Sequence, residues 1–379
     1  MTGKERILCT MEGGIPDRVP VTLFVQQEYL SYYYGKGGMD RVRDAALLAA
    51  ELGFDLITRQ LTHERAFWTR KSYQNWEVCK REEITDGNIH RHLEIRTPGG
   101  ILKQTESAPY NPATFEGVHF ITTKYMINSP EDFEIFRKYM PVQDNEYFEE
   151  MKSAAIEAHK LVGDLGICSP WGTGGVFNAA CILRDICQLC MDPYDDENFY
   201  REFMGFLTKI LEKDYEMLAQ TMHECIGMQG NMANGHMTGP DFFRKNIQPY
   251  EQQLIDAVKS RDKHVLYHNC GPAKSLYKNY KEMKMTVWET VSAPPQGDND
   301  IAEAKAILGK DMVLSGNMDQ IRFLKKASPG EVREATEKLM TICKPGGKYL
   351  FATSDYLESG TPQENVKAMI EAAKICGKY

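Results

Sequence analysis

Several features are missing from this sequence, and each absence narrows the classes of protein. No run approaches the roughly 18 consecutive apolar residues that cross a bilayer, so no membrane-spanning helix is expected. The opening residues, MTGKERILCTMEGG, lack the apolar centre and cleavage site of a secretory signal. No basic cluster interrupts a chain of net charge −8, which argues against nucleic-acid binding because phosphate contacts need a basic face. We expect a cytoplasmic protein with neither membrane nor nucleic-acid partners.

The cysteines of this sequence do not indicate a disulfide framework. Ten cysteines are spread over 379 residues with no secretory signal, so reduced thiols are the expectation. Some of these thiols are therefore available for metal binding. Internal repeats and low-complexity segments are also absent. The 42% apolar and 26% charged residues are ordinary for a globular protein.

Strand-like and helix-like segments alternate along the whole chain. Eight strands are predicted, each followed by helix, which is the pattern of a (β/α)₈ TIM barrel. A doubly wound sheet would alternate in the same way, but it usually carries a glycine-rich turn after its first strand, and FVQQEYL has none. We therefore predict one barrel domain over residues 1–379. The predicted strands are RVPVTLF, DLITRQ, LGICSP, CIGMQGN, HVLYH, MTVWET, MVLSGN and KYLFAT.

One region breaks this alternation after the second strand. Residues 76–120 read as β-hairpins, with turn signals at Asp86-Gly87 and at Pro98-Gly99-Gly100. We predict an inserted β-hairpin region at about residues 72–122.

In a barrel of this kind the active site is built from the loops that follow the strands. His268 and Cys270 end the fifth strand, Glu289 ends the sixth, and Asp355 follows the eighth. Zinc prefers tetrahedral nitrogen, sulfur and oxygen donors. Residues i and i+2 of a strand face the same side, so His268 and Cys270 converge if the strand continues to Cys270. These four residues are the predicted metal ligands; the alternative is a packed histidine beside an inert thiol.

Other side chains at the strand exits are weaker candidates. Trp171, Phe177 and Tyr267 are predicted walls of a substrate pocket, although the first two are residue types that more often fill a core. Asn234 is a predicted substrate contact, or only the start of an Asn-Gly turn. His236 is a candidate general acid for a leaving oxygen, or a solvated loop histidine.

In order and over nearly the whole chain, several motifs resemble the uroporphyrinogen decarboxylase superfamily. They are KERILCTMEGGIPDRVPV, TPGG, LYHNCG, ETVSAPP, LSGNMD and TSDYLESGTPQENVKAMIEAAK. The resemblance implies a (β/α)₈ barrel. One branch is the decarboxylases, which carry an arginine-rich segment after the first strand; FVQQEYL has no arginine there. The other branch contains zinc methyltransferases of corrinoid systems, whose HxC pair and following glutamate match His268, Cys270 and Glu289.

The sequence departs from that branch at one ligand position. Where the thiol-methylating members have a cysteine before the final TP, this chain has Asp355. A carboxylate leaves zinc more Lewis acidic than a thiolate does, which suits a methyl ether better than a thiol. The resemblance therefore implies an O-demethylase methyltransferase that transfers a methyl group, often from a methoxylated aromatic, to Co(I) of a partner corrinoid protein. No D-x-H-x-x-G corrinoid motif is present, so the corrinoid must come from the partner.

Three alternatives stay open at this stage. The chain could be a metal-free decarboxylase-like lyase, a methylcorrinoid:thiol methyltransferase, or a non-catalytic barrel that binds a small ligand or a corrinoid protein. The sequence also leaves open a homo-oligomer and the identity of the methyl donor.

Overall fold

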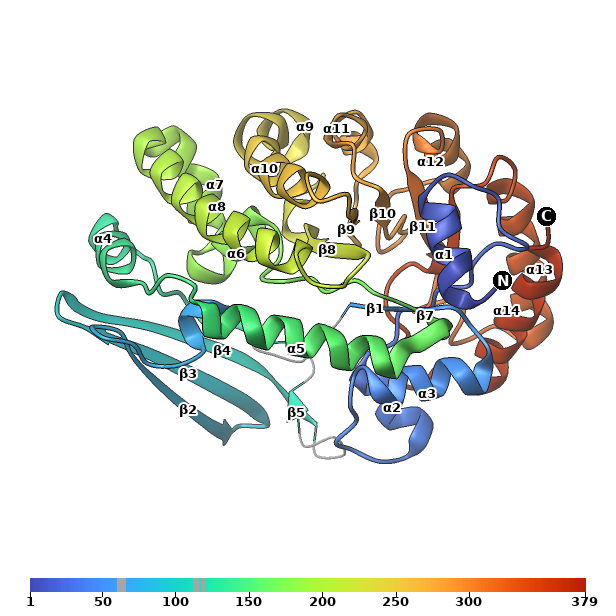
Figure 1. The fold of residues 1–379 in the computed structure, drawn as a ribbon, viewed down its shortest axis with the longest axis horizontal. Helices are drawn as coiled ribbons and strands as arrows, with labels where there is room; N and C mark the ends of the chain where they lie inside the picture. Colours follow the sequence, from blue (N-terminus) through green and yellow to red (C-terminus); the bar gives the residue numbers. More distant parts are fainter. Residues whose placement is uncertain (60–65, 112–115, 118–119) are drawn as a thin grey trace.

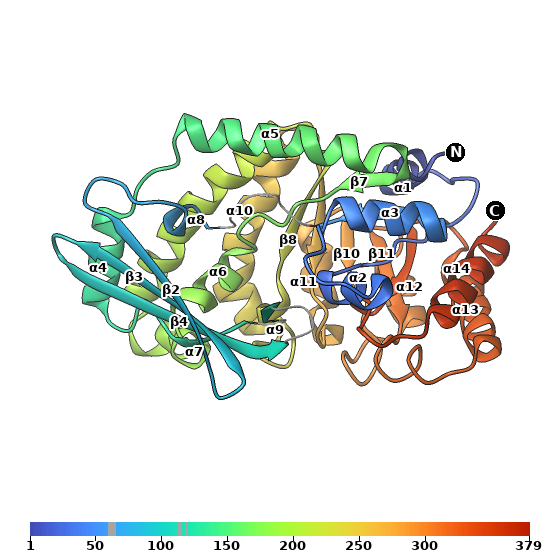
Figure 2. The ribbon, with the colours of Figure 1, turned by 90° about the horizontal axis from the view of Figure 1, so that it is seen from below.

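The computed structural model describes residues 1–59, 66–111, 116–117 and 120–379. Over these residues the chain forms an α/β fold in which helices surround a set of parallel strands, and a long antiparallel sheet projects to one side (Figures 1 and 2). The two termini lie side by side at the end opposite this projection, where the amide of Tyr379 donates to Asp17.

The strands are β1 (Leu56–Thr58), β2 (Glu77–Thr85), β3 (Asn88–Thr97), β4 (Gly100–Asn111), β5 (Glu116–Gly117), β6 (Ile121–Lys124), β7 (Gly166–Cys168), β8 (Cys225–Gln229), β9 (His264–His268), β10 (Val287–Glu289), β11 (Val313–Met318) and β12 (Tyr349–Thr353). The α-helices are α1 (Gly3–Met11), α2 (Gln27–Tyr34), α3 (Arg43–Leu52), α4 (Pro130–Tyr139), α5 (Asn145–Val162), α6 (Val176–Leu183), α7 (Ile186–Asp195), α8 (Glu197–Ala219), α9 (Gly239–Phe242), α10 (Gln248–Lys259), α11 (Tyr277–Met283), α12 (Ile301–Leu308), α13 (Pro329–Cys343) and α14 (Gln363–Cys376).

The parallel strands are arranged in two sheets. One has the order β12-β11-β10-β9-β8, and the other pairs β1 with β7. The amide of Gly227 donates to the carbonyl of Pro170 across the seam between β7 and β8, at 2.8 Å. The helices between consecutive strands make these parallel connections possible, because a parallel pair needs a long crossover.

The predicted first strand, residues 18–24, does not form a regular strand. Only an isolated bridge joins Val21 to Phe351 of β12, and another joins Arg18 to Lys378. Pro20 has no amide hydrogen, so it can accept a hydrogen bond from Phe351 but cannot donate one. The segment nevertheless lies between β12 and the start of β1, because the amide of Asp55 donates to the carbonyl of Val21 at 2.8 Å.

One small core lies on the inner side of the parallel strands. Its buried side chains come from α1 and from every strand of the two parallel sheets: Ile7, Met11, Ile57, Ile167, Cys225, Leu266, Val287, Val313 and Leu350. Since side chains alternate along a strand, residues two positions after these face the same side near the carboxyl ends of the strands. That alternation places Arg59, His268 and Glu289 together.

The antiparallel sheet follows β1 in the chain. Its turns lie where the sequence analysis expects them: Thr85 pairs with Asn88 across Asp86-Gly87, and Thr97 pairs with Gly100. Asp86 and Gly87 both have positive φ, 51° and 73°, as a two-residue hairpin of the I′ type requires. The central strand β3 buries Ile89 and Ile95, whereas Arg91 and Arg96 are exposed.

Residues next to the helix ends cap several helices. Ser328 caps α13 and forms a capping box with Glu331, and Pro329 occupies the first turn. The helical stretch with Pro240 in its first turn is continuous but irregular: α9 passes through a π-helical stretch, Phe243–Ile247, into α10. No helix in the described part of the chain combines the length and apolar character needed to cross a bilayer.

Candidate functional site

Three potential metal ligands converge at the carboxyl ends of the parallel strands. His268 ends β9, Cys270 lies two residues later, and Asp355 follows β12. One ligand atom from each lies within 4.8 Å of the others. The strand stops at His268 and does not continue to Cys270, yet the two side chains still converge. His268 is buried, whereas the Asp355 side chain is 13% exposed, so solvent reaches the group from the Asp355 side.

Glu289, the fourth predicted ligand, is placed differently. It ends β10 directly beside His268 in the parallel register. Its Oε2 atom lies 3.2 Å from His268 Nδ1, and it is not part of the three-residue group. A carboxylate that holds one ring nitrogen fixes the tautomer and directs the other nitrogen to a metal. Accordingly, Nε2 is the atom that faces Asp355, at 3.9 Å from Oδ1.

Arg59 is a site residue that the sequence analysis missed. Its Nε donates to Glu289 Oε2 at 2.9 Å, Nη2 also bonds the carboxylate, and both side chains are fully buried. Arg59 follows β1 directly, so reading the exit of that strand by the rule applied to the other strands would have identified it. The guanidinium also lies over the Phe24 ring, 4.5 Å from its centroid.

Burial and neighbouring charges set the protonation of this group. Burial alone would raise the pKa of Glu289, but Arg59 and His268 outweigh it and lower the pKa to about 2. Burial alone would lower the pKa of His268, but its hydrogen bonds to Cys270 and Glu289 raise the pKa to about 10. Burial, reinforced by Asp355, raises the pKa of the Cys270 thiol. Binding of a divalent cation here must therefore release protons.

Aromatic rings border the imidazole. The centroid of Trp171 lies 5.0 Å from that of His268, and that of Phe24 lies 5.9 Å away. Tyr356 packs edge-on against Phe24 at 6.1 Å. Trp171 is thus beside the site, as its position after the third predicted strand suggests, whereas Phe24 and Tyr356 were not singled out in the sequence.

Tyr267 and Phe177 are not at the site. Tyr267 alternates with His268 and points to the opposite side of β9, where its ring packs against Tyr280 of α11 at 5.8 Å. Phe177 is fully buried in α6 within the main core, and its amide donates to Glu251.

His236 and Asn234 occupy the loop after β8. His236 is 70% exposed, and its Nε2 lies 3.6 Å from Asp298. Asn234 Oδ1 accepts from the amides of His236 and Met237, which is the hydrogen bonding of an Asx turn. Asn234 also packs against Gly271. A Cβ atom added to Gly271 would lie 3.0 Å from the Cβ of Asn234. Asn234 therefore supports the loop that carries Cys270.

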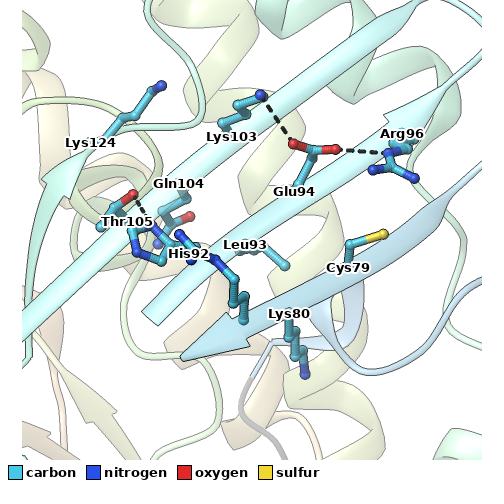
Figure 3. Close-up of a pocket in the computed structure, with 11 residues that line it drawn as sticks. Cys79, Lys80, His92, Leu93, Glu94, Arg96, Lys103, Gln104, Thr105 and Lys124 are labelled. Carbon is cyan, nitrogen blue, oxygen red and sulfur yellow. Dashed lines mark hydrogen bonds and ion pairs between the residues drawn. The ribbon is translucent and has the colours of Figure 1, made fainter. Parts of the chain in front are cut away.

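A hollow of about 360 Å³ lies elsewhere, on the antiparallel sheet (Figure 3). Its side chains come from β2, β3, β4 and β6. Glu94 bonds both Arg96, at 2.7 Å, and Lys103, at 3.1 Å. Its lining is basic, with Lys80, Arg81, Arg96, Lys103 and Lys124 beside the single carboxylate of Glu94. The hollow therefore differs in chemistry from the group of candidate ligands around His268.

The donor set around His268 fits a borderline-soft divalent metal. Imidazole nitrogen, thiolate sulfur and carboxylate oxygen are the zinc donors found in proteins, and a centre with three protein ligands keeps a position for substrate. The hydrogen bond from His268 to Glu289 leaves Nε2 as the metal-facing atom. The fold and this site therefore define an α/β protein with a candidate divalent-metal centre.

Comparison with known proteins gives the family. The uroporphyrinogen decarboxylase (URO-D) family model matches residues 117–375, and the chain belongs to this family, which confirms the sequence-based resemblance. It is 26% identical over 142 residues to the methylcobamide:CoM methyltransferase MtbA of Methanosarcina acetivorans, covering 38% of this chain and 39% of that protein. It is 25% identical over 140 residues to the uroporphyrinogen decarboxylase of Gloeobacter violaceus, covering 36% and 37%. The matched stretch thus spans about two fifths of these curated relatives.

A solved structure covers the whole chain. A methyltransferase from Methanosarcina mazei superposes with a TM-score of 0.71 at 14% identity, covering 99% of both chains. At this identity the likeness concerns the fold.

Proposed function

We propose that the protein is a zinc-dependent methyltransferase that transfers a methyl group from a methyl ether to Co(I) of a corrinoid carried by a partner protein. The observation that carries the proposal is the convergence of His268, Cys270 and Asp355 within 4.8 Å, in a family whose members include methylcobamide methyltransferases. The leaving oxygen takes up a proton, so the products are a methylated corrinoid and an alcohol or phenol.

We infer a closed (β/α)₈ barrel as the scaffold, with residues 18–24 in the position of the first strand. The hydrogen bonds from that segment to β12 and to Asp55, and those across the β7–β8 seam, support closure. The antiparallel sheet is then an insertion into a single domain, and the ligand group lies at the barrel mouth.

His268, Cys270 and Asp355 would hold the zinc. When bound, the zinc supplies Lewis acidity toward the ether oxygen. Glu289 keeps the His268 imidazole oriented, and Arg59 keeps Glu289 ionised and fixed. Trp171, Phe24 and Tyr356 offer apolar surface for a methoxylated aromatic ring. His236 stays a candidate proton donor that would have to reach the site by movement of its loop.

A thiol methyltransferase is the second candidate, favoured by the names of the MtbA relatives. Asp355 weighs against it, because a more electron-rich, thiolate-ligated zinc keeps a bound thiol nucleophilic. A decarboxylase-like activity is weakened by Arg59: its guanidinium is buried against Glu289, so it does not offer a free charge to a substrate carboxylate.

The test is a methyl-donor screen with Co(I) cobalamin on protein purified without chelator and analysed for metal. Methyl ethers are run beside methylcobalamin with a thiol acceptor, and uroporphyrinogen serves as the decarboxylase substrate. We expect bound zinc and zinc-dependent demethylation of an ether. Thiol methylation without ether demethylation would favour the second candidate, and turnover unaffected by zinc removal would overturn both.

A further inference from the structure

A second group of metal-type side chains lies away from the His268 site. His159 is in the last turn of α5, Cys168 ends β7, and His223 precedes β8. One ligand atom from each lies within 4.8 Å of the others. The rings of His159 and His223 are 5.3 Å apart between centroids. Cys168 is on the opposite side of β7 from Ile167, which lies in the inner core, so this group is outside the parallel strands.

Glu224 lies beside this group, next to His159. Its Oε2 lies 3.6 Å from His159 Nε2, while Oε1 pairs with Lys4. Among the described residues, both His159 Nε2 and Glu224 Oε2 are buried without a hydrogen-bond partner. Buried polar atoms in folded proteins are nearly always bonded, to protein, water or an ion. Two such atoms that face one another beside a thiol and a second imidazole point to a bound group between them.

We propose that His159, Cys168 and His223, with Glu224 beside His159, form a second, structural binding site for zinc or a similar borderline-soft divalent cation. Two imidazoles and a thiolate supply three ligands, and a shift of the Glu224 carboxylate toward them would complete a tetrahedral shell. A shell with no open position is the mark of a structural site. Glu224 is 23% and His159 10% exposed at the side chain, so a cation has a route in from solvent.

The protonation of these side chains is compatible with metal binding. Burial lowers the pKa of His159, which leaves a neutral imidazole as the ligand at neutral pH. Burial raises the pKa of the Cys168 thiol to about 12, so the cation must displace that proton. The positive charges of Lys4 and Lys263 repel a cation at this place. Because Glu224 Oε1 pairs with Lys4, only Oε2 is available to the cation.

The location gives this site a role. The ligands come from α5 and β7 on one side and from the α8–β8 connection on the other, so a metal would bridge the seam between the two parallel sheets. There β7 and β8 form no regular ladder, and the bonds across the seam include Gly227 to Pro170 and Ser169 Oγ to Cys225 Sγ, at 3.3 Å. The proposal does not depend on the methyltransferase function.

The test uses the Cys270→Ala protein, which lacks the thiol of the first group. We expect it to keep about one zinc per chain, and to show thiolate-to-cobalt charge-transfer absorption when Co(II) replaces zinc. Adding Cys168→Ser should abolish that absorption. Adding His159→Gln should weaken zinc binding by more than about 100-fold. A residue that only donates a hydrogen bond to a metal ligand costs about 10–100-fold when it is removed, so a larger loss indicates a direct ligand. His264→Gln, another half-buried histidine, is the matched control and should keep the metal.

A second measurement guards against variants that fold poorly. In Cys270→Ala, zinc should slow amide hydrogen exchange at residues 166–170 and 223–229, and it should not do so after His159→Gln. The proposal is overturned if Cys270→Ala binds neither zinc nor cobalt, or if its metal binding survives His159→Gln unchanged. Failure of the unmodified protein to demethylate any ether, with metal still bound to His159 and Cys168, would count against the proposed function alone.

Discussion

Glu289 is held from two directions at once. Arg59 bonds both carboxylate oxygens, and His268 Nδ1 lies 3.2 Å from Oε2. In a fully buried setting, breaking one member of such an ion pair leaves the other as an uncompensated charge. Glu289 thus connects the stability of the fold to the orientation of the metal-facing imidazole.

Glu289→Gln should affect stability and metal affinity together. Removing the charge opposite Arg59 should lower the free energy of unfolding by about 3–5 kcal/mol, and loss of the histidine's partner should weaken zinc binding by about 10–100-fold. Urea unfolding and chelator competition measure the two effects. Glu364→Gln, at an exposed position of α14, is the control. If Glu289→Gln loses neither stability nor zinc affinity, Glu289 has no such role.

Asp355→Cys tests the proposed preference for an ether. The cysteine should bind zinc at least as well, because a thiolate is a softer donor than a carboxylate. Ether demethylation should fall by more than metal content, since the metal loses Lewis acidity. Zinc analysis beside initial rates with Co(I) cobalamin gives the comparison. Equal zinc and equal rates in the two proteins would mean that Asp355 does not touch the metal.

At the residue scale, sequence reasoning could place the ligands but not their roles. Strand ends meet at one rim, so His268, Cys270 and Asp355 could be predicted to converge. Glu289 could bind the metal itself or hold the metal-binding His268. The positions of its carboxylate oxygens decide between these roles, and a sequence pattern does not contain those positions. The alternation that points His268 toward the candidate ligands points its neighbour Tyr267 to the opposite side of β9, and this side could have been inferred from the strand pattern.

At the scale of elements, buried carboxyls lie on two outer helices. Asp214 of α8 accepts from Gln143 and Thr173, and Glu251 of α10 accepts from the amide of Phe177. Burial raises the pKa of each to about 7, only partly opposed by these hydrogen bonds. Both groups therefore keep a proton in the folded chain at pH values where the unfolded chain has released it.

The sign of the resulting pH dependence follows from linkage. For Glu251 the contribution is present below the ordinary carboxyl pKa of 4.5 and is lost as the pH rises through about 7. The loss is at most about 1.4 kcal/mol per pH unit in that window. Glu251→Gln should therefore flatten the fall in unfolding free energy between about pH 5 and 7, as measured by urea titration at each pH. Parallel pH profiles for the variant and the wild type would contradict this assignment, and Glu364→Gln should follow the wild type.

Turns and helix ends could be predicted from the sequence where a few neighbouring residues determine them. The turn at Asp86-Gly87 and the cap at Ser328 depend on a few neighbouring residues. Residues 18–24 have the composition of a strand, but Pro20 removes a donor and the segment's partners lie far away in the sequence. Its hydrogen bonding is set by tertiary contacts that a local pattern does not contain.

At the scale of the whole molecule, Asp55 connects the N-terminal segment to the parallel strands. It is 2% exposed and accepts from Arg6, Arg18 and the amide of Val21. Arg6 also bonds Asp17, whose side chain is 45% exposed. These contacts lie at the opposite ends of the strands from His268.

Asp55→Ala should destabilise the fold without altering the chemistry of the site. We expect a loss of about 3–5 kcal/mol, because two arginines lose a buried counter-charge. Asp17→Ala is the matched control and should cost about 0–1 kcal/mol, as an exposed pair does. Thermal and urea unfolding measure both variants, and zinc content per folded chain should stay constant. Equal losses in the two variants would show that burial of Asp55 does not matter.

The isolated bridge between Val21 and Phe351 has a consequence for biosynthesis. The segment around Val21 leaves the ribosome more than 300 residues before its partner in β12. Until then the edge of this segment that later pairs with β12 has no neighbour, and an unpaired strand edge in a growing chain invites association with other chains. Fragments that end before Phe351 should therefore precipitate or be degraded, and expression of the intact protein should benefit from slow translation and from chaperones that hold nascent chains.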